Sequence, residues 1–484
     1  MGEEEKLVGM SERVEEDITK ETRKIRENFH IFGLATLVYA CIYAFCMHKN
    51  DAGVSYLLFV AAGLFYVKFC GTHLDLPERK GSLFYKISML LLAVSTFCTD
   101  DARIIFFNKT GVFLLMITMV LSRVFQTKEW GFTKYMLTIL QSAFMAVGEL
   151  FQPFSDAIYF CKDKLGNKGK TILYAVLGIV LAIPVFAIVL NLLMNADAVF
   201  GNMTNELLAE LNFGNLFGVL FRVALLFFFA YGVLSYLAKR TIREDNVTIK
   251  QNEPVIAIPM AGILTALYLV FSVVQILGLF LGKMELPEGY TYARYAREGF
   301  FQLLAVSILN LILVLWGLYF FKKSKVLLVL LTMMSGCTFI MIASSAMRMV
   351  MYIRQYHLTF LRILVLWGLA VLTILFVGVL LQMYRKQFSL FRYCVVVVTV
   401  SYLLLSFSHP DYVVAKYNVA KLDELTVNEN DGYYRGLCAD AATVLVPYMD
   451  EKEARQRWYD EDADTVRKFN VSRFVAKRLL DGER

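Results

Sequence analysis

The sequence is poor in charge and in the motifs that usually identify an enzyme. Only 19% of its 484 residues are Asp, Glu, Lys or Arg, whereas a soluble domain has about 25%. The five histidines lack metal-ligand spacing, and no HExxH, GxSxG or GxGxxG pattern occurs. Gly169-Lys170-Thr171 resembles the end of a phosphate-binding loop, but Lys164 stands where its first glycine is required. We therefore predict no metal and no cofactor, and a non-enzymatic role is favoured.

Paired cysteines and a cleavable leader are also missing. The eight cysteines form no CxxC pair, and seven of them lie in or beside apolar runs, which is typical of small core residues. The first 29 residues are charged and contain no apolar stretch, so we expect no cleavable signal peptide. The modest net charge of +7 is a signal of membrane orientation and predicts no nucleic-acid partner.

Long apolar runs dominate what is present, and 58% of the residues are hydrophobic. A hydrocarbon core of about 30 Å requires roughly 17–25 apolar residues, and only a helix satisfies its own backbone there. The runs predict an all-α, polytopic integral membrane protein with about eleven transmembrane helices. They lie near residues 31–47, 52–70, 83–98, 106–125, 171–194, 215–237, 257–282, 298–320, 325–347, 360–383 and 391–407.

One further apolar segment, residues 131–161, carries Lys134, Glu149 and Pro153. We interpret it as a helix in the membrane interface, anchored by Trp130. A buried twelfth span is the alternative.

Lys and Arg gather in alternate connections between the runs, which indicates the orientation because cytoplasmic loops are enriched in them. We predict three parts in a cell-membrane protein. Residues 1–29 form a cytoplasmic charged arm, and residues 30–407 form the transmembrane domain with its interfacial segment. Residues 408–484 form a small helical extracytoplasmic tail, since apolar residues recur there at helical spacing.

Charged and polar residues collect where several runs reach the outer face. A charge within the membrane costs about 2.5–3.5 kcal/mol even on a lenient scale, so such residues pair, line a cavity or snorkel. The functional interpretation is a basic chamber open to the outside, which binds an anionic lipid headgroup or a small anion. The structural alternative is ion pairing or snorkelling of each residue. The candidates are Asp197, Arg222, Arg297, Glu298, Gln302, Arg348 and Arg362, with Asp100, Asp101 and Arg103 joining the third and fourth runs.

Four segments together carry a resemblance: LLMNADAVF (192–200), YAREGFFQL (295–303), RMVMYIRQYHLTFLR (348–362) and HPDYVVAKYN (409–418). They resemble a bacterial family of multi-pass membrane proteins, the domain-of-unknown-function 4153/4173 group. The resemblance implies a bacterial inner-membrane protein with an external helical tail, and no activity. It also points to Tyr356, Asp411 and Asn418 as site residues. The chain departs from the expected pattern at Asn195, at His357 in place of Gly and at His409 in place of Asn.

Three functions remain open at this point. The first is a non-enzymatic envelope sensor or scaffold, in which the tail is the surface for a protein partner. The second is a transporter or lipid-handling protein that uses the basic chamber; no deep intramembrane acid and no inverted repeat support it. The third is a membrane enzyme on a lipid-linked substrate, for which Asp197, Glu298 and His357 are the candidate acids or base.

Overall fold

The computed structural model contains helices as the regular elements of its described residues, which confirms the all-α prediction. An isolated bridge pairs Asn252 with Phe321. The described residues are 19–79, 81–127, 130–163, scattered positions between 178 and 200, 213–240, 252–277, 292–385, 388–421, 431–434 and 436–482.

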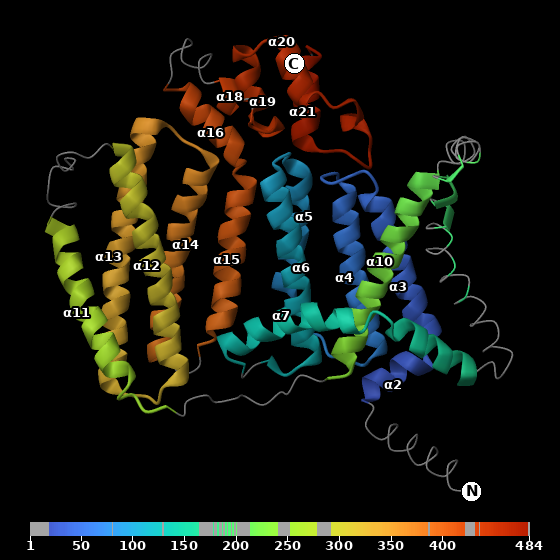
Figure 1. Ribbon diagram of the computed structural model, residues 1–484, viewed down its shortest axis with the longest axis horizontal. Coiled ribbons are helices and arrows are strands. Elements are labelled where there is room, and N and C mark those ends of the chain that lie inside the picture. Colours follow the sequence, from blue (N-terminus) through green and yellow to red (C-terminus); the bar gives the residue numbers. More distant parts are fainter. Residues whose placement is uncertain are drawn as a thin grey trace, which may run out of the picture. The chain divides into compact units, whose positions relative to one another are not determined.

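The chain divides into two compact units, and each is described here by itself (Figure 1). Unit 1 comprises Met1–Ala93, Val112–Lys128 and Met136–Glu244, and unit 2 comprises Val94–Gly111, Glu129–Tyr135 and Asp245–Arg484. Unit 1 holds α2 (Lys20–Glu27), α3 (Phe29–Met47), α4 (Ser55–His73), α10 (Phe213–Ala238) and most of α5 (Ser82–Cys98) and α7 (Phe132–Gly148). The helix α6 (Ala102–Val124) contributes its first part to unit 2 and its second part to unit 1.

Unit 2 contains long apolar helices followed by short ones. The long helices are α11 (Ala257–Gln275), α12 (Tyr292–Phe320), α13 (Lys325–Tyr356), α14 (Phe360–Tyr384) and α15 (Leu390–Phe407). We call the described residues 410–482 the C-terminal domain. Its helices are α16 (Pro410–Val419), α18 (Asp431–Tyr434), η3 (Ala439–Ala441), α19 (Ala442–Leu445), η4 (Val446–Tyr448), α20 (Glu451–Trp458), η5 (Glu461–Asp464) and α21 (Val471–Leu480).

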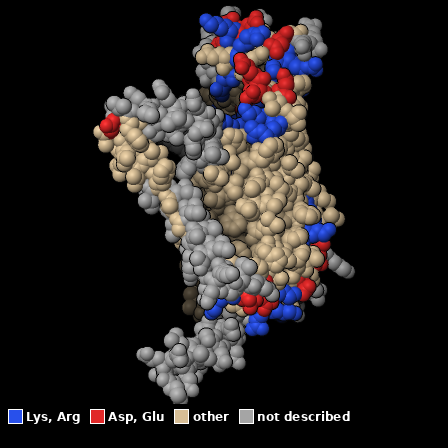
Figure 2. Space-filling view, turned by 90° about the vertical axis from the view of Figure 1, so that its right-hand side faces the viewer, with Lys and Arg blue, Asp and Glu red and all other residues tan. Residues whose placement is uncertain are grey.

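Nine of the described helices are long and apolar enough to cross a membrane. They match nine of the eleven predicted runs, and the run at 83–98 forms the shorter apolar helix α5. The run at 171–194 lies almost wholly outside the described residues. Apolar side chains such as Leu34 and Phe65 face outward at 62% and 70% exposure, and Figure 2 shows a largely uncharged face. These features fit a membrane protein, because a hydrocarbon solvent favours exposed apolar side chains.

The predicted interfacial segment forms α7 and a second helical stretch at 152–163. Within unit 1, Figure 1 shows α7 crossing the direction of α3 and α4 instead of following it. Gly232 of α10 allows a close approach here, since a Cβ at that position would lie 2.8 Å from the Ala146 carbonyl oxygen. The placement of this segment in the interface stays a prediction.

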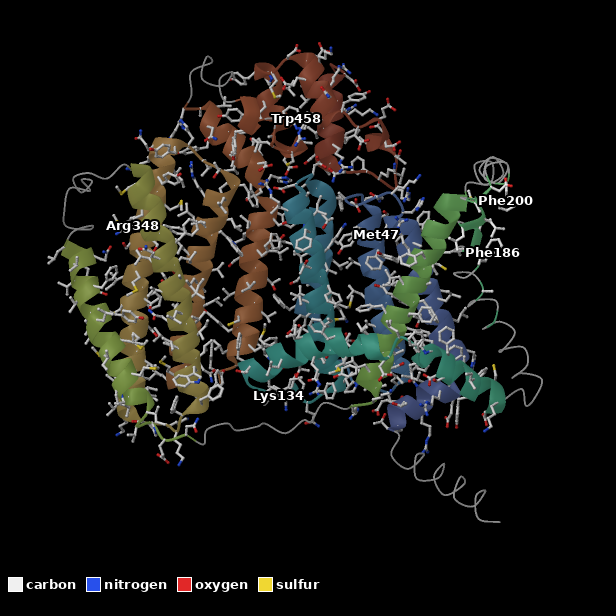
Figure 3. The ribbon with its side chains drawn as sticks, in the orientation of Figure 1. Met47, Lys134, Phe186, Phe200, Arg348 and Trp458 are labelled. Atoms are coloured by element: carbon white, nitrogen blue, oxygen red, sulfur yellow. The ribbon has the colours of Figure 1, made fainter. Side chains whose placement is uncertain are left out.

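The C-terminal domain shares one apolar core with α12, α13 and α14. Phe300, Ile353 and Phe376 from the long helices meet Val414 and Trp458 from the domain, all less than 9% exposed. Figure 3 shows Trp458 within the domain. A buried aromatic side chain contributes several kcal/mol to such packing. The domain therefore rests on the Tyr356 end of α13, and the Lys325 end of that helix lies at the opposite end of unit 2.

Candidate functional site

A half-exposed arginine, Arg103, joins two buried aspartates where the C-terminal domain meets the start of α6. The side chain of Asp101 caps α6 by accepting a hydrogen bond from the Arg103 N–H at 2.9 Å. The Arg103 guanidinium donates to both Asp101 oxygens, at 2.8 and 2.7 Å, and to Asp411 Oδ1 at 2.6 Å. Asp101 and Asp411 are only 2% and 1% exposed. The guanidinium also lies 3.6 Å from the centre of the Phe360 ring, so one cation joins α6, α14 and α16.

Asp440 forms a second contact between the domain and the turn that joins α5 to α6. Its carboxylate accepts hydrogen bonds from the Thr99 hydroxyl at 2.5 Å and the Asp100 N–H at 2.9 Å. The His409 Nδ1 lies 3.0 Å from the same carboxylate. His409 stands between α15 and α16 and has a left-handed backbone with φ of 49°. Three segments far apart in the sequence are thus held by one buried acid.

The protonation states of His409 and Asp440 follow from their contacts. The hydrogen bond to Asp440 raises the pKa of His409 above its ordinary 6.5, and this outweighs burial, which lowers it. Burial alone would raise the pKa of Asp440, but hydrogen bonds from His409, Ser472, Thr99 and the Asp100 N–H lower it below 3.8. The geometry therefore favours a charged imidazolium beside an ionised carboxylate.

The helix α21 provides a third contact with the same turn. Asn470, which is fully buried, donates from Nδ2 to the Thr99 carbonyl at 2.8 Å, and its Oδ1 caps α21. The Ser472 hydroxyl donates to the Cys98 carbonyl at 2.7 Å, and Arg473 donates to Asp100 Oδ1 at 2.6 Å. The bonds from Asn470 and Ser472 satisfy carbonyl groups at the end of α5 that have no partner within the helix. We call the three contacts together the docking network.

Asn418, a predicted site residue, binds the connection between α13 and α14. Its Oδ1 accepts from the Leu358 N–H at 2.8 Å, and its Nδ2 donates to the Leu358 carbonyl at 2.9 Å. Asn418 is 2% exposed, so this bidentate bond is shielded from water. Asn418 and Asp411 both lie on α16, and they hold that helix against the α13–α14 connection and the start of α6, respectively. The structure thus gives both residues docking contacts.

The predicted basic residues of α12 and α13 lie on neighbouring helices. Figure 3 shows Arg348 on the part of α13 nearer the C-terminal domain. Its guanidinium fills the space over Gly299 of α12, where an added Cβ would come within 2.0 Å of Nη1. Arg297 and Glu298 precede Gly299 on α12, but their side chains lie outside the described residues. Gln302 is exposed.

Arg362 and Tyr356 lie at the connection between α13 and α14. The Arg362 guanidinium donates to the carbonyl groups of Tyr356 and His357 and lies 4.2 Å from the centre of the Tyr352 ring. It thereby satisfies carbonyl groups at the end of α13. The Tyr356 side chain is exposed. Arg362 thus has local partners that explain its position.

His357 is strained, which agrees with the glycine that the family pattern predicts there. Its φ of 61° and ψ of 178° lie in a region that is almost exclusive to glycine. We expect His357→Gly to raise the free energy of unfolding by about 1–3 kcal/mol through release of this strain. The thermal midpoint of the detergent-solubilised protein measures the effect. His30→Gly, within α3, should instead lose about 1 kcal/mol, and a loss at position 357 would contradict the prediction.

Two predicted residues belong to unit 1. The Arg222 Nη1 lies 2.9 Å from His48 Nδ1 at the end of α3, and Asp197 accepts a hydrogen bond from the Phe200 N–H at 2.9 Å. Arg297 and Arg348 belong to unit 2. A single chamber that combines Arg222 with Arg297 and Arg348 therefore stays a prediction.

The docking network contains residues that sequence reasoning did not select, chiefly Asp440, His409, Asn470 and Arg473. Asp440 had a detectable signal, because it is a lone acid in the apolar run 437–446. Such an acid needs a buried partner. The others stand in polar segments, where nothing in the sequence separates them from solvated neighbours.

Three potential metal-ligand atoms also meet in the network, from Asp101, Asp411 and Cys438, all within 4.8 Å of one another. Arg103 already supplies positive charge to both carboxylates. Burial raises the pKa of the Cys438 thiol well above its usual range, and metals bind the thiolate. The set therefore fits an arginine-bridged contact better than a metal centre.

The docking of the C-terminal domain should depend on pH through His409. A raised folded-state pKa means that the stabilisation is fully present below pH 6.5 and is lost as pH rises through the folded pKa. At acid pH, the titrations of Asp100 and Asp440 change the folding stability in opposite directions. Burial raises the pKa of Asp100, whereas hydrogen bonds lower the pKa of Asp440. We therefore expect the thermal midpoint to fall between pH 6 and pH 9. His409→Gln should flatten this fall, and an unchanged slope would contradict it.

The fold and the site together define an all-helical membrane protein whose C-terminal helices are docked on the ends of its apolar helices. A family model described as Domain of unknown function (DUF4153) matches residues 87–448. The chain belongs to this family, as the four sequence segments predicted. No match was found among curated proteins or among solved structures.

Proposed function

We propose that the protein is a non-enzymatic scaffold or sensor of the bacterial cell membrane. Its multi-pass domain holds the C-terminal domain on the outer face as a surface for a protein partner. The docking network is the observation that carries this proposal. An enzyme or transporter places its buried charges around a cavity for the substrate. Here the buried Asp411 bonds to Arg103 and the Cys438 N–H, and the buried Asp440 bonds to His409, Thr99 and the Asp100 N–H.

The apolar core supports the same function. The domain follows the long helices without a long linker, because only Ser408 and His409 separate α15 from α16, and α16 packs against the long helices. A surface held in a fixed orientation loses less entropy when it binds a partner. The exposed apolar residues Tyr433, Tyr448 and Val466 of the domain, at 40%, 38% and 83% exposure, offer anchors for such a partner.

Photo-crosslinking in living cells tests this function. A photoreactive residue at Val466 should give a discrete protein adduct. One at Leu404 of α15, which is 71% exposed on an apolar helix, should give lipid adducts only. Protease added to spheroplasts should remove a C-terminal tag if the domain is outside. Cells with a deletion phenotype but no protein adduct from Val466, Tyr433 or Tyr448 would contradict the scaffold function.

A second function, lipid or anion handling at the outer face, is supported by the Arg348 side chain that lies over Gly299. The charge pattern places Arg297 and Arg348 near one end of α12 and α13, and their site would take an anionic lipid headgroup or a small anion. Under this function, the Arg348→Ala variant should fold normally but fail to support the cellular function of the wild-type protein. Loss of folding would assign Arg348 a structural role instead.

A further inference from the structure

A cavity lies at the end of unit 2 that is remote from the C-terminal domain. It is open on one side, has a volume of about 390 Å³, and is lined by the end of α12, the start of α13 and the end of α14. Lys322, Lys323, Lys325 and Arg385 line it, so we call it the basic cavity. Its volume is within the range of about 300–1,000 Å³ that is common for ligand sites.

The basic cavity has an excess of positive charge. Lys322 pairs with Glu253, and among the described residues no ion pair is found for Lys323, Lys325 or Arg385. The α13 helix begins in the same place, and its cap residue Ser324 makes no side-chain cap bond. The first N–H groups of any α-helix have no acceptor within the helix, so the start of α13, whose residues line the cavity, adds partial positive charge there. An anion is the ligand that this arrangement favours.

The remaining walls are apolar or aromatic. Leu327, Leu328 and Leu331 form one wall, and Tyr319 forms part of another. Trp316, one turn earlier on α12, and the exposed Tyr384 at the end of α14 lie at the same end of the helices. Trp and Tyr concentrate where a bilayer changes from hydrocarbon to headgroup. The cavity thus combines a charged rim with apolar walls at headgroup level.

We propose that the basic cavity binds the phosphate headgroup of an anionic lipid, with the acyl chains against the apolar walls. Basic pockets between membrane helices are suited to this ligand because they offer cations to the phosphate and leave the chains in hydrocarbon. A free phosphate ion would use the same cations but would gain nothing from the leucine wall. The site is independent of the proposed scaffold function, since it lies at the opposite end of unit 2 from the docking network.

Native mass spectrometry of the delipidated full chain with dioleoyl phosphatidylglycerol tests this site. The variant K323Q/K325Q/R385Q removes three lining cations, and K416Q/K452Q/R478Q removes the same charge from exposed positions of the C-terminal domain. Each cation near the membrane surface contributes about fivefold in affinity, so the first variant should bind about 100-fold more weakly. The control variant should stay within about threefold of wild type. Phosphatidylcholine should bind neither variant nor wild type at this site.

Two further measurements distinguish lipid binding from a folding failure and from binding of free phosphate. Leu328→Trp fills the cavity without a change in charge and should also weaken phosphatidylglycerol binding at least tenfold, which covers the case in which the triple variant fails to fold. Inorganic phosphate is tested as a competitor at the same concentration. Displacement of the lipid by phosphate at that concentration would assign the site to free phosphate. Equal binding by wild type, Leu328→Trp and K323Q/K325Q/R385Q would overturn the proposal.

Discussion

Replacement of Arg103 by Gln should release the C-terminal domain and cost about 3–5 kcal/mol of stability. The variant removes the cation between Asp101 and Asp411, which are 2% and 1% exposed, and leaves two carboxylates buried side by side. Uncompensated buried charge is among the most destabilising changes known in proteins. Hydrogen exchange of the amides in residues 410–482 measures the release directly, because protected amides become exchangeable when the domain opens.

Arg478→Gln is the matched control for this experiment. Arg478 lies on α21 of the same domain and is exposed, with its guanidinium 5.3 Å from the Phe474 ring centre. It should cost less than about 1 kcal/mol. Adding Asp411→Asn to Arg103→Gln should recover part of the loss, since one excess carboxylate is removed. Equal losses in Arg103→Gln and Arg478→Gln would show that Arg103 does not hold the domain.

Asp440→Ala should have the second-largest effect, about 3 kcal/mol, for a different reason. It removes the acceptor of the Thr99 hydroxyl, the Asp100 N–H and the His409 ring in one step. Each buried donor left without a partner costs about 1–3 kcal/mol, and rearrangement or entry of water recovers some of this. The thermal midpoint should fall sharply, and its dependence on pH above 6.5 should disappear with the acid.

Two further variants separate charge from hydrogen bonding at Asp440. Asp440→Asn keeps an acceptor for Thr99 and Asp100 but removes the negative charge that favours the imidazolium. It should retain more stability than Asp440→Ala and still lose the pH dependence. Asp464→Ala removes an acid that is 56% exposed and pairs with Lys477, and it should cost under about 1 kcal/mol. A pH profile that survives in Asp440→Asn would exclude the His409–Asp440 pair as its source.

The apolar helices could be predicted from the sequence because a membrane selects each one locally by length and composition. The run at 360–383 became Phe360–Tyr384, and the run at 391–407 became Leu390–Phe407. The boundaries of a helix were predicted less accurately where the helix extends beyond its apolar run. The run at 325–347 belongs to a helix that continues to Tyr356, because Arg348 and Arg354 end the apolar stretch without ending the backbone hydrogen bonds.

The docking network could be predicted only in part. The position of Asp101 directly before a helix is a local capping signal. Its partner through Arg103 is Asp411, 308 residues from Arg103 in the chain, and no sequence spacing encodes such a pairing. The family resemblance selected Asp411 and Asn418, whose contacts are structural in unit 2. We predicted that basic residues converge at the outer face from the distribution of charge along the sequence. That distribution does not determine how separate helices are arranged in space.

The contact between Asn470 and the Thr99 carbonyl has a consequence for biosynthesis. The two residues are 371 positions apart, so a ribosome that adds about 5–20 residues per second makes the second roughly 20–70 s after the first. Until then the turn that closes the α5–α6 hairpin has water in place of its final partners. The α5–α6 hairpin therefore gains its last hydrogen bonds only after α21 has been synthesised. A chain truncated before α21 would leave this turn without those partners and accessible to membrane proteases.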